Sequence, residues 1–151
     1  MLIKTHLAIT VFFILLFIPA VNHDPIFVSV ALIATFLPDL DSRYSTLGRK
    51  KLARVLQWFT KHRGLIHSFT FLIFMTFIFV FFIPVIAFGF FLGYGLHLVA
   101  DSFTVYGIRP FYPSKNVLSG NLKTGAKVEK ALFFSLIVVD VMVFVWRVSI
   151  I

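Results

Sequence analysis

Residues 69–91 form an almost unbroken apolar run, FTFLIFMTFIFVFFIPVIAFGFF, that contains no charged side chain. Such a run suits the hydrocarbon core of a bilayer, which is about 30 Å thick. The rest of the chain agrees, because 60% of its 151 residues are hydrophobic and 13% are charged, whereas a soluble domain is nearer half apolar. The length and composition predict one membrane-embedded domain that covers residues 1–151.

Five apolar segments follow one another and predict an all-α, polytopic membrane bundle. Pro84 divides the long run, and NHDP and Pro38 bound the earlier segments, because proline disfavours helical geometry around it. At about 1.5 Å per residue, the first two segments cover only roughly 18–22 Å. They therefore form either a hairpin across a thinned bilayer or a re-entrant pair. The predicted segments are 7–21, 26–37, 65–83, 85–103 and 131–145.

Two further segments need a separate assignment. Residues 50–59, KKLARVLQWF, carry Leu52, Val55, Leu56 and Phe59 at helical spacing, which predicts a short amphipathic helix on the membrane surface. The first apolar segment follows a basic residue, as a signal peptide would. However, a histidine precedes it and the next apolar segment comes almost at once, so we interpret it as a retained helix.

The net charge of +8 predicts orientation and lipid contacts rather than nucleic-acid binding, because the basic residues cluster beside apolar segments. One Lys precedes the first segment, seven Lys and Arg residues lie between the second and third, and five lie between the fourth and fifth; Arg147 alone falls on the other side. By the positive-inside rule, the N-terminus is cytoplasmic and the C-terminus is outside.

The acids and histidines also gather at the cytoplasmic ends of the segments. The chain contains no cysteine, so a metal site would have to use His, Asp and Glu. All five segments bring at least one such residue to the same membrane level. These residues are His6, Asp39, Asp41, His62, His67, His97, Asp101 and Glu129.

The spacing of these residues favours a shared metal. His97 and Asp101 are four apart and share a helix face, and imidazole with carboxylate suits zinc or another divalent ion. Asp39 and Asp41 point the same way if their segment is extended. A shared metal would remove the repulsion between them and the cost of burying them.

His62 and His67 are harder to bring together. Five residues apart, they would lie roughly 140° apart on a continuous helix. They converge only if the third helix begins after Gly64, as we expect. Of the two, His67 is the better candidate ligand. His62 could bind the metal, donate a hydrogen bond to another ligand, or contact the substrate.

Each polar residue also has a simpler role when it is taken alone. His6 could cap a helix, Asp39 could belong to a turn, and His97 with Asp101 could form a structural hydrogen bond. Arg63 could be an ordinary membrane anchor. When the residues are considered together, these simpler roles are less well supported than a shared site, because ionisable residues within membrane segments are energetically expensive and usually functional.

Four motifs spread over most of the chain resemble the YdjM-like family of bacterial inner-membrane proteins. They are THL at 5–7, LPDLDSRYSTLG at 37–48, HRGLIHS at 62–68 and GYGLHLVADSFTVYG at 93–107. The family is described as membrane-bound, metal-dependent hydrolases. The resemblance therefore implies a helical, multi-pass protein of a bacterial inner membrane with a divalent-metal site.

Carried over by position, the resemblance implies a ligand set for that metal. Two departures weaken it: Ser42 stands where members often carry His, and Ile66 stands where Thr is common. The implied metal ligands are His6, Asp39, Asp41, His62, His67, His97 and Asp101, and Gly125 with Glu129 matches a Gly-x-x-x-Glu element before the last helix.

These observations predict metal-assisted hydrolysis at the cytoplasmic membrane face. The ligands are numerous enough for one or two ions; zinc is the first expectation, and manganese or magnesium are alternatives. Glu129 or Asp41 would act as base toward a metal-activated water, and Arg63 would hold an anionic group bidentately. The predicted substrate is an anionic lipid or a lipid-linked phosphoester.

Two other classes of function stay open from the sequence. A metal-ion transporter or sensor predicts a polar path across the membrane, yet only Asp140 lies well inside a segment beyond the site. A non-catalytic regulatory membrane protein predicts acids and histidines that merely pair with one another. Bound metal would separate this last class from the first two.

Overall fold

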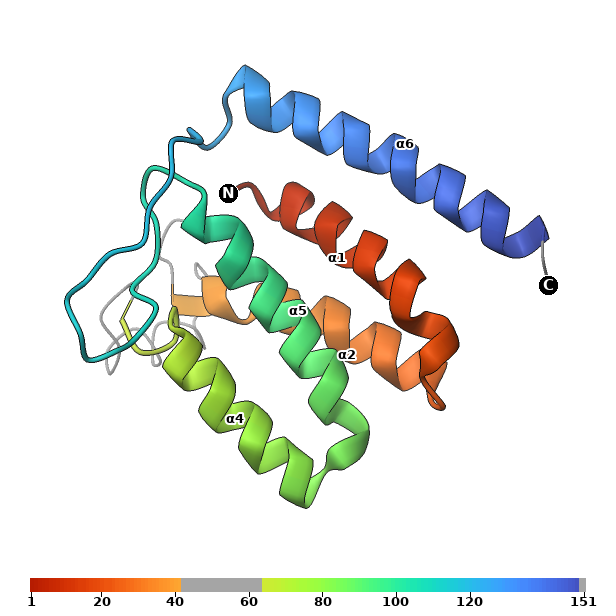
Figure 1. Cartoon of the computed structure of the whole chain (residues 1–151), viewed down its shortest axis with the longest axis horizontal. Helices are drawn as coiled ribbons and strands as arrows, with labels where there is room; N and C mark the ends of the chain where they lie inside the picture. The colour runs from red at the N-terminus through yellow and green to blue at the C-terminus, as the bar shows by residue number, and fades with distance from the viewer. Residues whose placement is uncertain (42–63, 150–151) are drawn as a thin grey trace.

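A computed structural model describes residues 1–41 and 64–149, and within them the chain is all-α, as predicted. Two 3₁₀ turns, η1 and η2, follow the first two helices (Figure 1). The predicted surface helix at 50–59 lies outside the described residues. The elements are α1 (Ile3–Phe17), η1 (Ile18–Ala20), α2 (Asp24–Phe36), η2 (Pro38–Asp41), α4 (Phe69–Phe82), α5 (Pro84–Ser102) and α6 (Lys127–Ser149).

The helix boundaries differ from the predicted segments at their polar ends. α1 begins at Ile3 and α6 at Lys127, each four residues earlier than predicted, so that His6 and Glu129 lie inside helices. α4 begins four residues later, because the Ser68 side chain caps it by accepting a hydrogen bond from the Phe71 amide at 3.2 Å. Residues 64–68 are consequently a turn.

α5 is the centre of the bundle. It packs against α2, α4 and α1, whereas α6 lies along α1 and against no other described helix (Figure 1). Successive helices reverse direction, and the start of α1, the end of α2, the end of α5 and the start of α6 meet at one end. One cluster of buried core residues lies between α2, α4 and α5 and includes Ala34, Leu72, Phe90, Tyr94 and Leu98.

The α2–α5 contact is close enough to require a glycine. A Cβ atom added to Gly93 would lie 2.0 Å from the Ala31 carbonyl oxygen. The two helix backbones therefore touch at this point, one turn before His97. This contact fixes the distance between the C-terminal end of α2 and the C-terminal end of α5, which carries His97.

Lengths and exposed side chains fit a membrane environment. Within the described residues, three helical stretches are long and apolar enough to cross a bilayer, namely Ile3–Ala20, Pro84–Ser102 and Lys127–Ser149, whereas α2 and α4 are shorter apolar helices. Large apolar side chains such as Phe77 and Phe81 are more than 60% exposed. An apolar surface of this kind would be a liability in water and is expected against lipid.

The segment 103–126 folds back over the polar end of the bundle. Isolated bridges join Thr104 to Leu122 and Ile108 to Leu118. The Phe69 amide donates to the Pro110 carbonyl oxygen at 2.9 Å. That bond ties the segment to the beginning of α4, next to the turn that carries His67.

Candidate metal centre

Five of the predicted metal ligands lie together at the polar end of the bundle. They come from four parts of the chain: α1, η2, the turn before α4, and α5. Two groups of three each place one ligand atom per residue within 4.8 Å of the others, and both groups include His97. The groups are His6, His97 and Asp101, and Asp39, His67 and His97; we call their five residues the His/Asp cluster.

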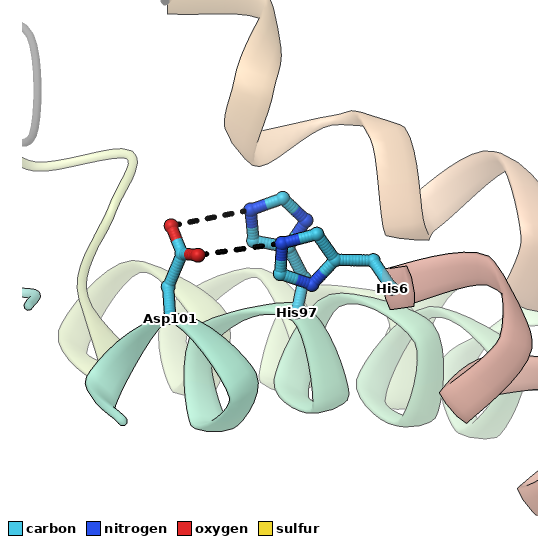
Figure 2. Close-up of side chains that lie close together, drawn as sticks. All are labelled: His6, His97 and Asp101. Atoms are coloured by element: carbon cyan, nitrogen blue, oxygen red, sulfur yellow. Dashed lines mark ion pairs between the residues drawn. The ribbon is translucent and has the colours of Figure 1, made fainter. Parts of the chain in front are cut away.

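Asp101 is the carboxylate on which three imidazoles converge. Its oxygens lie 3.3 Å from His6 Nε2, 3.6 Å from His67 Nε2 and 3.8 Å from His97 Nε2; Figure 2 shows the His6 and His97 contacts. All four residues are at most 2% exposed. The Met1 amine also forms an ion pair with Asp101, so that this carboxylate is a focus for positive charge.

The imidazole rings pack against one another. The rings of His6 and His97 are stacked, with centroids 3.9 Å apart and planes 5° from parallel, and the His67 ring is nearly perpendicular to that of His97. Two protonated rings would repel at this separation, so the packing disfavours a charge on both rings at once. The neutral imidazole is the form that binds metals.

His97 is held in one tautomer by the end of α2. Its Nδ1 lies 2.8 Å from the Thr35 carbonyl oxygen, and because a carbonyl only accepts hydrogen bonds, Nδ1 must carry the proton. The lone pair then sits on Nε2, which has no hydrogen-bond partner among the described residues. It lies 3.8 Å from both Asp39 and Asp101.

This donor set fits a divalent cation. A lone pair that faces two carboxylates leaves three electron donors directed at one another, which is unfavourable in a buried site unless positive charge is present. The Met1 amine supplies part of that charge at Asp101. Burial also raises the pKa of the Asp39 carboxyl, although His67 and His6 act in the opposite direction. A cation among these groups would stabilise the ionised carboxylates and use the free nitrogen of His97.

Glu129 lies at the same end of the bundle but is engaged in a different way. Its carboxylate accepts hydrogen bonds from the Leu2 amide at 2.6 Å, the Thr5 hydroxyl at 3.1 Å and the Gly125 amide, and it is fully buried. It belongs to neither group that could hold a metal. Glu129 thus fastens the start of α1 to the start of α6, one turn from His6.

We expect Glu129→Gln to lower stability while leaving bound metal in place. The amide would present N–H groups to donors that now meet a carboxylate, and leaving buried donors unsatisfied costs about 1–3 kcal/mol each. Thermal unfolding in detergent, together with metal analysis, measures both quantities. The exposed neighbour Lys130→Gln is the control. Unchanged stability with lost activity would instead favour the predicted role of Glu129 as base.

The remaining predicted residues are not part of the described cluster. Asp41 is the last residue of η2, and its side chain is outside the described part. His62 and Arg63 also lie outside it. Their predicted roles as ligand, base or anion contact stay predictions.

Sequence reasoning missed the Thr35 carbonyl, which orients His97. A signal for it was available, because the last four carbonyls of a helix have no partner within the helix. Pro38 marks the end of α2, so Thr35 was bound to present such a carbonyl to whichever side chain packs there.

Comparisons with known proteins show which family this chain belongs to. No solved structure gives a significant match. The chain is 33% identical over 98 residues to an uncharacterized protein, YvsG, of Bacillus subtilis (strain 168); the match covers 62% of this chain and 61% of that protein's length. The model of the YdjM inner membrane protein family matches residues 1–150. The chain therefore belongs to the YdjM inner membrane protein family.

Proposed function

We propose that this protein is a membrane-bound, metal-dependent hydrolase that acts on a phosphoester of a lipid-linked substrate. The observation that carries the proposal is the buried His/Asp cluster, in which the free Nε2 of His97 faces two carboxylates. Purely structural histidines usually find hydrogen-bond partners when they are buried. The unpartnered Nε2 of His97 instead supports a bound divalent ion.

The ligand set suits one or two ions. His97 is common to both groups of three, so either two ions share its surroundings or one ion is bound while the other residues support its ligands. Three imidazoles favour zinc over magnesium, which prefers oxygen ligands. When bound, the ion would supply Lewis-acid activation of water.

The chain's own residues would carry the other parts of the reaction. Arg63 would hold the phosphate through two hydrogen bonds. Asp41 is the better candidate for the base, since the Glu129 carboxylate already accepts three hydrogen bonds. Water would add to phosphorus and the ester P–O bond would break. The proton lost by water would pass through the carboxylate to the leaving oxygen.

The proposed location is the cytoplasmic face of the inner membrane. Membership of an inner membrane family and the apolar helices support the membrane itself. With five crossings, the gathered ends of the helices would face the side rich in Lys and Arg, which is cytoplasmic. The basic residues around this end would attract an anionic lipid headgroup.

We expect metal-loaded protein in detergent to release phosphate or a phosphorylated headgroup from extracted bacterial lipids. Asp101→Asn should lower the rate by at least about 100-fold, because it weakens the shared centre. Mass spectrometry of the lipid products measures the reaction. Asp24→Asn, at the exposed first residue of α2 at the other end of the bundle, is the control.

Absence of hydrolysis across a broad lipid panel would count against this activity. If the same protein then released its metal across sealed vesicles, the transporter class would replace the hydrolase. If it bound no metal, the regulatory class would do so.

A further inference from the structure

An apolar cavity of about 380 Å³ lies between α2, α4 and α5. Its wall contains no polar surface, and its volume is in the range of small-molecule sites. Three of its residues come from α5, and others come from facing positions on α2 and α4. The lining includes Val30, Ile33, Leu37, Met75, Phe90 and Tyr94.

On α5 the cavity wall runs directly into the His/Asp cluster. Ile86, Phe90 and Tyr94 line the cavity, and His97 and Asp101 continue the same series at helical spacings of three and four. Residues at these spacings share one helix face. The wall and the cluster thus form one stripe, with Tyr94 only about 4.5 Å along the helix axis from His97.

On the other two sides, a residue that lines the cavity is a close sequence neighbour of a cluster residue. Leu37, at the end of α2, lines the cavity two residues before Asp39. Ile66 also lines it and directly precedes His67. The Tyr94 hydroxyl donates to the Ile66 carbonyl oxygen, which holds the α5 wall of the cavity against the turn that carries His67.

At its side the cavity reaches the lipid-facing surface, because its lining residue Ile33 is 61% exposed. A second apolar cavity, on the opposite side of α4, takes its α5 wall from Phe91, Leu92, Gly95 and other residues. Those positions belong to a different face of α5 from His97. Only the first of these two cavities combines an exposed apolar wall with alignment to the cluster.

We propose that this cavity binds one hydrocarbon chain of a lipid whose phosphate lies at the His/Asp cluster. The phosphate half of this inference rests on the proposed function, whereas the chain-binding half rests on the cavity. From Ile86 to Tyr94 the α5 wall extends about 12 Å. The site would therefore select esters with a long chain over soluble phosphoesters.

The test uses the full chain in phosphatidylcholine vesicles that contain a trace of phosphatidylglycerol with a photoactivatable diazirine at one acyl terminus. Labelled positions are mapped by mass spectrometry. Met75→Trp fills the cavity, and Ile33→Trp narrows its exposed side from α2. Val80→Trp is the matched control, because Val80 is on α4 and exposed but does not line the cavity. Thermal unfolding in detergent reports whether each variant is folded.

We expect labels on the cavity wall, and a roughly tenfold loss of that labelling in Met75→Trp and Ile33→Trp, because the chain's volume is filled. Val80→Trp should label as the wild type does. Equal labelling of all exposed apolar residues, or labelling unchanged in the two cavity variants, would overturn the proposal.

A hydrolysis measurement separates this proposal from the proposed function. The cavity variants should lose turnover of a long-chain ester but keep that of a water-soluble short-chain ester. Cavity labelling without hydrolysis of either ester by the wild type would reject the hydrolase and leave the lipid site standing. Hydrolysis of both esters at rates that the cavity variants do not change would reject the lipid site alone.

Discussion

Replacing His97 with alanine is expected to remove almost all bound metal. His97 is common to both groups of three potential ligands, and its Nε2 is already directed between two carboxylates. Loss of a group that only supports a ligand costs roughly 10- to 100-fold in metal affinity, so the loss of a shared ligand should exceed that. Metal content of protein purified in detergent, measured by mass spectrometry, gives the result.

His23→Ala is the matched control for this variant. His23 is exposed in the turn before α2, at the opposite end of the bundle, and its loss should leave metal content unchanged. Asp101→Ala should behave like His97→Ala. If both cluster variants kept all the metal of the wild type, the ion would have to be bound elsewhere.

Gly93→Ala is expected to produce a large loss of stability. The new Cβ would meet the Ala31 carbonyl oxygen at 2.0 Å and its carbon at 2.8 Å. Because these are backbone atoms, the helices must separate, at a cost of roughly 1–3 kcal/mol or more. That exceeds the gain of about 1 kcal/mol in helix propensity. Separation would also move Thr35 away from His97 and weaken metal binding.

Gly95→Ala distinguishes this close approach from a general effect on the helix. Gly95 is two residues further along α5, and its added Cβ would meet only a side-chain methyl group of Leu72, at 3.3 Å. This variant should unfold near the wild-type temperature, whereas Gly93→Ala should unfold at least about 5 °C lower. Equal unfolding temperatures for the two variants would contradict the packing described for α2 and α5.

The convergence of the cluster could be predicted from the sequence because topology alone requires it. Each apolar segment reverses the chain, so polar residues at alternate segment ends must meet at one level of the bundle. The i, i+4 spacing of His97 and Asp101 then gave their shared face. Pro38 predicted the end of α2, and this placed Asp39 at the same end of the bundle as His97 and Asp101.

Other features depend on tertiary contacts that no local pattern reports. Glu129 was predicted as a catalytic base because of its level in the membrane. Its hydrogen bonds to Leu2 and Thr5 depend on α6 packing beside α1, and the bonded residues are 127 and 124 positions apart in the chain. The start of α4 depended on which residue supplied the cap. The Ser68 side chain does so, and this leaves His67 in a turn.

The most direct test of the proposed metal centre is the metal content of the full chain, purified in detergent and reloaded with zinc after chelation. The His/Asp cluster predicts about one or two tightly bound ions per chain. It also predicts retention through gel filtration, and loss in the His97→Ala variant but not in His23→Ala. The proposed metal centre would be contradicted by wild-type protein that shows a cooperative thermal unfolding transition, and is therefore folded, but retains no zinc, manganese or magnesium.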